Sequence, residues 1–221
     1  MPAEEGVSDE LVVVVAGGGP LSSRAADAVP HGAVVIAADD GLDQAQALGL
    51  EVTLAVGDFD SASDEAVARA EAAGTRIERH PTDKDATDLE LALDAASKLR
   101  PSRILVIAPR GGRLDHELAG LLALASDRNA GSQIDALVGE AHVHVVRGGR
   151  TLASQAGELV SLLAVNGPAE GVRTEGLVYP LRGETLEPGS TRGVSNVFAT
   201  VSARVEVARG VVLAIRPGAN P

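Results

Sequence analysis

The chain has 221 residues, no cysteine, two phenylalanines, one tyrosine and a net charge of −12 at pH 7. This length can bury a core without disulfides or a structural metal, and the acidic balance argues against nucleic acid as a partner. The apolar runs are much shorter than the roughly 20 residues of a membrane span, and residues 1–10 lack the basic segment of a signal peptide, so we expect a soluble cytoplasmic protein.

Short β-branched runs alternate with helical patterns over the first 140 residues. The strand-like runs are 11–16, 33–39, 52–58, 75–80 and 103–109. The helical patterns are 42–48, 64–74, 88–99 and 110–125. This alternation predicts an α/β domain with a doubly wound, Rossmann-like parallel sheet over residues 1–140. The nearly continuous apolar strands indicate that both faces of the sheet are covered.

The helical period disappears after residue 140. Four strand-like segments follow, at 141–146, 158–165, 176–181 and 200–215. In the last one, Val201, Ala203, Val205 and Val207 alternate with polar residues, which predicts a half-buried antiparallel strand. We therefore expect a second, all-β sandwich domain over residues 141–221.

Polar residues of the first half gather at the ends of the predicted strands. Glycines 17–19 follow the first strand, Asp39 and Asp40 the second, and Asp58 and Asp60 the third. The segment PTDKDATD (81–88) follows the fourth, and Gly111, Gly112 and Arg113 follow the fifth. Because ligands of open parallel sheets bind beyond the carboxyl ends of the strands, these groups are expected around one crevice.

Each of these features also has a structural explanation. A glycine run after a strand is equally compatible with a simple turn and with a phosphate-binding loop, and Asp39–Asp40 alone favours a turn or helix cap. TDLE (87–90) matches a capping box, with Thr87 as the N-cap and Asp88 in the first turn, which does not exclude function. The buried stripe predicted for this helix is Leu89, Ala92, Leu93, Ala96 and Leu99.

Two features favour a ligand more strongly. Arg113 at the start of a helix opposes the helix dipole, so an anion site is favoured over a merely solvated position. In GDFDS (57–61), the side chains of Asp58 and Asp60 are expected on one side, where they would repel each other without a cation between them. Mg²⁺ is the expected ion, because it prefers hard oxygen ligands, whereas the five histidines lack zinc-site spacing.

Four motifs in this order resemble the thiamine diphosphokinase (thiamin pyrophosphokinase) family: GDFDS (57–61), KDATDLELAL (84–93), GGRLDH (111–116) and SN (195–196). ADDG (38–41) and GLVYPL (176–181) resemble further blocks, and the similarity spans residues 12 to 216. The resemblance implies an α/β nucleotide-binding domain followed by a β-sandwich, and a homodimer with its active sites at the subunit interface. It implies transfer of the diphosphate of ATP to the hydroxyl of thiamine, leaving AMP.

The resemblance also implies roles for individual residues. The metal ligands would be Asp39, Asp58, Asp60 and Asp88, and the catalytic set would be Asp58, Asp60, Asp88 and Arg113. The ATP-binding residues would be Gly18, Gly19, Lys84, Asp85, Thr87, Gly111, Gly112 and Arg113. The thiamine-binding residues would be Asp115, His116, Ser195 and Asn196. The general base is not identified by the sequence.

The chain also departs from the family pattern. Asp40 stands where the family usually has glycine, Arg110 stands where it usually has threonine or a small residue, and there is no tryptophan to stack on the pyrimidine, as in some members. Two other functions stay open: a diphosphokinase with another hydroxymethyl acceptor, such as a pterin, and a non-catalytic sensor of thiamine diphosphate or nucleotide. Four carboxylates around a metal argue against the sensor.

Overall fold

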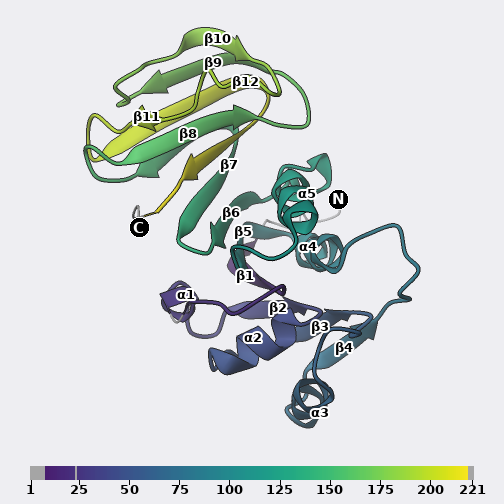
Figure 1. Ribbon diagram of the computed structural model, residues 1–221. Helices are drawn as coiled ribbons and strands as arrows, with labels where there is room; N and C mark the ends of the chain where they lie inside the picture. Colours follow the sequence, from purple (N-terminus) through teal and green to yellow (C-terminus); the bar gives the residue numbers. More distant parts are fainter. Residues whose placement is uncertain (1–7, 23, 219–221) are drawn as a thin grey trace, which may run out of the picture. The chain divides into compact units, whose positions relative to one another are not determined.

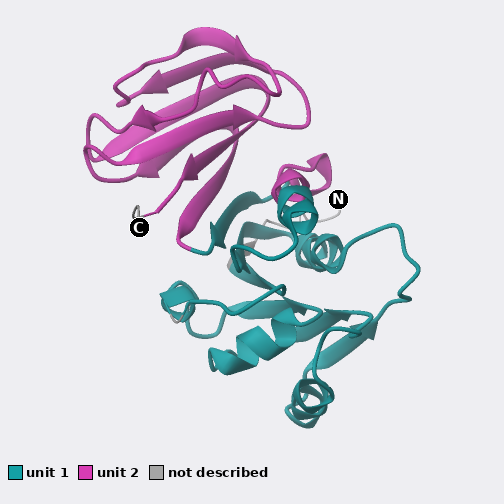
Figure 2. Cartoon of the chain, viewed as in Figure 1, with its two compact units in different colours: residues 1–120, 131–139 teal, residues 121–130, 140–221 magenta. Residues whose placement is uncertain are grey.

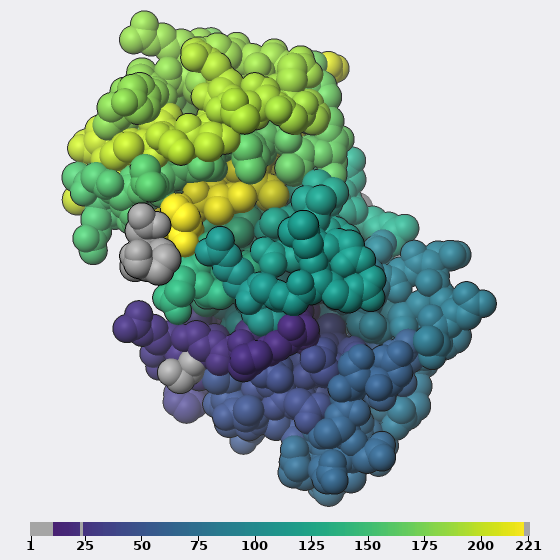
Figure 3. All heavy atoms as spheres, in the orientation of Figure 1, coloured from purple at the N-terminus to yellow at the C-terminus, as the bar shows by residue number. Residues whose placement is uncertain are grey.

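The computed structural model describes residues 8–22 and 24–218 (Figure 1). The chain forms two compact units (Figure 2). Unit 1 contains the chain up to Gly120 together with Gly131–Gly139, and unit 2 contains Leu121–Ala130 and the chain from Glu140 onward. Figure 3 shows the same face with all heavy atoms drawn as spheres and coloured along the sequence.

Unit 1 is built on a parallel sheet with the strand order β6-β5-β1-β2-β3-β4. The strands are β1 (Ser8–Ala16), β2 (Val34–Ala38), β3 (Leu54–Gly57), β4 (Arg76–Arg79), β5 (Pro101–Ala108) and β6 (Gln133–Val138). The predicted doubly wound sheet is confirmed, although β6 was not among the predicted strands. Val12 to Val15 of the central strand β1 are all buried, which shows that both faces of the sheet are covered.

The helices are α1 (Arg24–Asp27), α2 (Gly41–Ala47), α3 (Asp64–Ala72), α4 (Asp88–Lys98) and α5 (Leu114–Leu124), whose last residues belong to unit 2. Figure 1 shows α2 and α4 on opposite faces of the sheet. The N-cap of α4 is Thr87, whose hydroxyl accepts from Glu90 N–H at 3.2 Å, as predicted. The predicted buried stripe was wrong at Leu99, which follows the helix as its C-cap and is 53% exposed.

Unit 2 is antiparallel throughout its described pairings. Its strands are β7 (Ala141–Ala153), β8 (Leu159–Ala164), β9 (Ala169–Glu175), β10 (Arg182–Leu186), β11 (Asn196–Val197) and β12 (Ser202–Arg216), and the 3₁₀ helix η1 is Asp127–Asn129. The register of β12 against β7 shifts between Val207 and Val212. β12 also pairs with β9, from Arg204 to Arg209, and then with β8, from Val212 to Ile215.

This change of partner lets one long strand serve two sheet layers, and the predicted sandwich-like β fold is confirmed. Phe198, Leu162, Val205 and Val212 are among the fully buried side chains between the strands.

Two predictions for this half were wrong. The segment 176–181 is not a strand: it makes only an isolated bridge, between Leu177 and Phe198, since Gly176 is in the left-handed region at φ +80° and Pro180 has no N–H to donate. Val201 precedes β12 and is 73% exposed, so the predicted buried alternation begins only at Ala203. Among the described residues, no helix has both the length and the apolar content that a membrane crossing requires.

Candidate active site

The loop after β3 separates an apolar side chain from two acidic ones. Phe59 is 9% exposed and packs into the cluster that contains Ala37, Leu42 and Val67, and Arg79 Cζ lies 5.0 Å from the centre of its ring. The backbone of Phe59 is left-handed, at φ +60°. The buried ring therefore anchors the loop, and the flanking carboxylates stay at the end of the sheet.

Three carboxylates from the ends of β2 and β3 meet at this edge. Asp39, Asp58 and Asp60 each offer an oxygen that lies within 4.8 Å of the others. Gly57 permits the approach, because a Cβ there would lie 3.2 Å from both the Asp39 Cα and the Asp88 Oδ1. The sequence predicted these residues as ligands, and the structure brings them together with Asp88, the first residue of α4.

The cluster contains buried oxygens that accept no hydrogen bond. They are Oδ1 of Asp39 and Oδ1 of Asp58. Oδ1 of Asp88 is also buried, but it lies 3.1 Å from Lys84 Nζ as an ion pair. Buried polar atoms without partners are uncommon and destabilising, and a hard divalent cation is the partner that carboxylate oxygens suit best. The residues present therefore fit a Mg²⁺-type ion.

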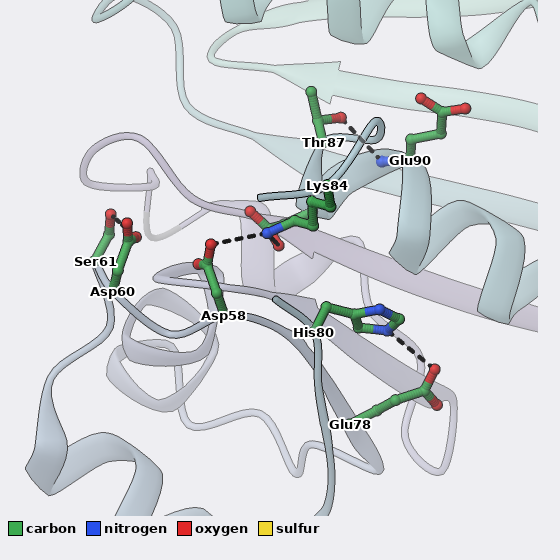
Figure 4. Close-up of polar contacts among 9 residues, drawn as sticks. Asp58, Asp60, Ser61, Glu78, His80, Lys84, Thr87 and Glu90 are labelled. Carbon is green, nitrogen blue, oxygen red and sulfur yellow. Dashed lines mark hydrogen bonds and ion pairs between the residues drawn. The ribbon is translucent and has the colours of Figure 1, made fainter. Parts of the chain in front are cut away.

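Lys84 compensates part of the acidic charge (Figure 4). Its Nζ donates to Asp58 Oδ2 at 2.8 Å and lies 3.1 Å from Asp88 Oδ1. The side chains of Lys84 and Asp58 are only 13% and 9% exposed. The hydrogen bond from Lys84 holds the pKa of Asp58 below its usual value. The sequence predicted that the carboxylates of Asp58 and Asp60 would repel each other without a cation, and in the structure Lys84 supplies a positive charge beside Asp58.

Asp39 forms no ion pair with a lysine or arginine in the part of the chain that the structure describes. Burial, together with the nearby carboxylates of Asp88, Asp40 and Asp58, raises its pKa from 3.8 to about 6, although a hydrogen bond from the backbone of Asp40 acts in the opposite direction. At neutral pH this acid is held ionised in a site that opposes its charge, which is the electrostatic setting of a cation site.

Three of the other groups with predicted phosphate roles, Gly18, Gly111 and Arg113, are each paired with an acid of the same chain. Gly18 N–H donates to Asp40 Oδ2 at 3.0 Å, and Gly111 N–H donates to Glu117 Oε2 at 3.3 Å. Carboxylates thus occupy these donors in the structure.

Arg113 makes a two-pronged contact with Asp115, Nη2 to Oδ2 at 2.6 Å and Nε to Oδ1 at 3.2 Å. This contact lowers the pKa of Asp115 to about 2. Both side chains are mainly exposed, so Arg113 is accessible to a ligand.

The remaining predicted residues of unit 1 have simpler surroundings. Asp85 and His116 are exposed, and the Thr87 hydroxyl caps α4. Gly19 is left-handed at φ +149°, beside Pro109.

In unit 2, Asn196 has a structural role that is visible in its hydrogen bonds. Its Oδ1 accepts from Tyr179 N–H at 3.1 Å and from its own neighbour Val197 N–H at 2.9 Å, and its Nδ2 donates to Tyr179 O at 2.7 Å. Asn196 is 4% exposed, whereas Ser195, at φ +58°, is exposed. Asn196 therefore clamps the backbone of Tyr179.

Tyr179 is a candidate ligand residue that the sequence reasoning missed. Its side chain is 65% exposed although its backbone is held on both sides by the buried Asn196. It is the only tyrosine of the chain and lies in the GLVYPL block. The rarity of aromatic residues was the signal that could have singled it out.

Family models match both parts of the chain. Residues 26–134 match the thiamin pyrophosphokinase catalytic domain, and residues 146–212 match the thiamin pyrophosphokinase vitamin B1 binding domain. A thiamine pyrophosphokinase of Bacillus subtilis is 27% identical over 164 residues, which cover 73% of this chain and 77% of that protein.

Solved structures of relatives share the fold. A thiamine pyrophosphokinase from Bacillus subtilis has a TM-score of 0.83 at 24% identity, with 96% of this chain and all of that one covered. A thiamin pyrophosphokinase from Geobacillus thermodenitrificans has a TM-score of 0.79 at 25% identity, covering 95% of this chain and 98% of that one. The two family matches together cover well over half of the 221 residues, and the chain belongs to the thiamin pyrophosphokinase family.

Proposed function

We propose that the chain transfers the diphosphate group of ATP to the hydroxyl of thiamine. In this reaction the hydroxyl oxygen bonds to the β-phosphorus, and the bond from that phosphorus to the oxygen shared with the α-phosphate breaks. AMP leaves with the electron pair, and the hydroxyl proton is released. Membership of the family, through both its catalytic and its vitamin B1 binding domains, is the observation that carries the proposal.

The carboxylate cluster supports a divalent metal as the cofactor. Asp39, Asp58, Asp60 and Asp88 would hold Mg²⁺, because oxygens of the first three converge, and a buried oxygen of Asp39 and one of Asp58 accept no hydrogen bond. Asp88 lies beside this cluster, with its Oδ1 3.1 Å from Lys84 Nζ. When bound, Mg²⁺ would neutralise phosphate charge, which is the main requirement of phosphoryl transfer.

Lys84 and Arg113 would bind the phosphates of ATP. Lys84 lies beside the proposed metal ligands, so its ammonium can reach phosphates held at the same edge of the sheet. Arg113 carries a planar guanidinium that already holds two oxygens of Asp115, and a phosphate presents a similar pair. Arg113 would stabilise the negative charge that develops as AMP departs.

Unit 2 would bind the acceptor. Tyr179 offers an exposed ring on a backbone fixed by Asn196, and such a ring suits stacking against a flat heterocycle such as the pyrimidine of thiamine. Ser195 is exposed next to Asn196 and would add a hydrogen bond. Asn196 would then act by holding Tyr179 in place.

We further propose a homodimer, as the resemblance of the motifs implies, and a cytoplasmic location, as expected from the composition. Sedimentation of the purified chain tests the dimer: full activity of a monomer at nanomolar concentration would contradict a shared active site.

The function is tested by offering acceptors in parallel. The chain is incubated with ATP and Mg²⁺ together with thiamine, with a hydroxymethyl pterin or with no acceptor, and the products are separated. We expect AMP and thiamine diphosphate with thiamine only. AMP release that depends on the pterin, or no acceptor-dependent AMP at all, would contradict the proposal.

A further inference from the structure

The glycine turn after β1 already holds a carboxylate of the chain. Asp40 Oδ2 accepts from Gly18 N–H at 3.0 Å. A Cβ on Gly17 would lie only 1.4 Å from Asp40 Oδ1, so this carboxylate rests against the α-carbon of Gly17. Because glycine has no side chain, Gly17 leaves room for the Asp40 carboxylate.

A phosphate and Asp40 compete for the same turn. A phosphate bound there would require Gly18 N–H, which Asp40 occupies, and would meet a negative charge within hydrogen-bonding distance. The neighbouring turn lies close by, because a Cβ on Gly112 would be 3.1 Å from Gly18 O. We assign the phosphates to the second turn, because Arg113 directly follows Gly111 and Gly112, although Gly111 N–H also donates to a carboxylate, that of Glu117, at 3.3 Å.

The second carboxylate oxygen of Asp40, Oδ1, suits a hydrogen-bond donor rather than a phosphate. Asp40 is partly exposed, and no described residue donates to its Oδ1. An ionised carboxylate only accepts hydrogen bonds, so it attracts hydroxyl groups and rejects phosphate oxygens. The hydroxyl-bearing part of ATP is its ribose.

We propose that Asp40 is a specificity-determining residue at the Gly17–Gly19 turn. Its carboxylate excludes phosphate from this turn and accepts hydrogen bonds from the ribose hydroxyls of the nucleotide. This inference rests on the proposed ATP-dependent function and adds which part of ATP lies at which turn. The phosphates would then lie with Lys84 and Arg113, and the glycines of the first turn would contact ATP only beside its sugar.

Calorimetry with three probes tests this assignment in the presence of Mg²⁺: inorganic tripolyphosphate, ATP and 2′,3′-dideoxy-ATP. The variants are Asp40→Gly, which removes both the charge and the side chain that lies against Gly17, and Asp40→Asn, which removes only the charge. Glu71→Gln, an exposed position near the end of α3, is the control with the same change in net charge. Thermal melting of each protein verifies that it is folded.

We expect Asp40→Gly to bind tripolyphosphate at least about fivefold more tightly than wild type, the factor that one unit charge at about 4 Å gives even in bulk water. Asp40→Asn should gain less, and Glu71→Gln should not change. The preference for ATP over its dideoxy analogue should fall toward one in Asp40→Gly.

Equal tripolyphosphate binding in the folded wild type and Asp40→Gly would overturn the inference while leaving the proposed function intact. A gain in tripolyphosphate binding with an unchanged preference for ATP would overturn the ribose assignment. If no protein binds ATP or tripolyphosphate, the proposed function and this inference both fail.

Discussion

Lys84 Nζ lies 2.8 Å from Asp58 Oδ2, and both side chains are largely buried. This ion pair places one fixed positive charge inside the cluster of carboxylates that we propose for Mg²⁺. Lys84 therefore stabilises the protein without metal, and it also reduces the negative potential available to an incoming cation.

Lys84→Met should lower the free energy of unfolding without Mg²⁺ by on the order of 3 kcal/mol, because it leaves buried carboxylates uncompensated. Mg²⁺ should then raise the melting temperature more in this variant than in wild type. Lys98→Met, at an exposed position at the end of α4, the helix that follows Lys84, is the control and should resemble wild type in both respects. Identical Mg²⁺ responses in both variants would contradict a metal site next to Lys84.

Asp58→Asn and Asp60→Asn should separate stability from function. Asp58→Asn removes the hydrogen-bonded partner of Lys84 and should cost about 1–3 kcal/mol, whereas Asp60 is exposed and its replacement should be nearly neutral. Both should reduce turnover by roughly 100-fold or more if the two carboxylates hold the metal. Denaturant melts and steady-state kinetics measure the two effects, and wild-type turnover of both variants at ordinary Mg²⁺ would exclude the metal site.

The raised pKa of Asp39 predicts an unusual pH dependence of the free energy of unfolding. Its pKa is raised to about 6 from 3.8, so between these values the folded state binds more protons than the unfolded state. The free energy of unfolding without Mg²⁺ should therefore fall as pH rises from about 4 to 6, by up to about 3 kcal/mol from this group. The lowered pKa of Asp58 acts in the opposite direction, but below pH 3.8.

Urea unfolding of wild type and Asp39→Asn between pH 4 and pH 7 isolates this contribution. The variant should lack the fall between pH 4 and 6, and it should be more stable than wild type at pH 7. Parallel pH profiles of the two proteins would mean that Asp39 titrates normally.

Arg113→Lys should be a poor replacement, because an ammonium cannot hold two phosphate oxygens in one plane. We expect kcat to fall about 10- to 100-fold with little change in the KM for ATP, since the proposed charge develops in the transition state. Arg110→Lys is the matched control, because Arg110 is an exposed arginine of the same loop. An unchanged kcat with a raised KM would place Arg113 in ground-state binding instead.

Variants of Tyr179 and Ser195 test whether these residues bind thiamine, the proposed acceptor. Tyr179→Ala should weaken thiamine binding about tenfold through the loss of stacking, whereas Tyr179→Phe should keep most of it. Ser195→Ala should weaken thiamine binding by a smaller factor, and none of the three should alter ATP binding. Calorimetry decides: equal losses for both ligands, or no loss for either, would show that this loop does not bind the acceptor.

Much of the fold was predictable because its patterns are local. The alternation of apolar runs and helical periods predicted the parallel sheet, and Thr87 acts as the predicted cap because its hydroxyl needs only Glu90 N–H, three residues away. The strand prediction for 176–181 failed because a left-handed Gly176 and the clamp from Asn196 fix this segment as a loop. Neither influence can be recognised from hydrophobic periodicity.

The site was predictable in its residue types but not in its pairings. The carboxyl ends of parallel strands had to bring Asp39 and Asp58 together, and the structure does so. The sequence could not show that Lys84 would neutralise Asp58 or that Asp40 would take Gly18 N–H. Both contacts join residues more than 20 positions apart and depend on side-chain conformations that only the packed loops determine.

The most direct test of the proposed reaction follows the β-phosphate of ATP. ATP labelled with ³²P at the β-position is incubated with the chain, Mg²⁺ and thiamine, and the labelled and unlabelled products are quantified. The proposed reaction predicts that the label appears in thiamine diphosphate while unlabelled AMP forms in equal amount. Labelled ADP together with thiamine monophosphate, or label that stays in ATP, would contradict diphosphate transfer by this chain.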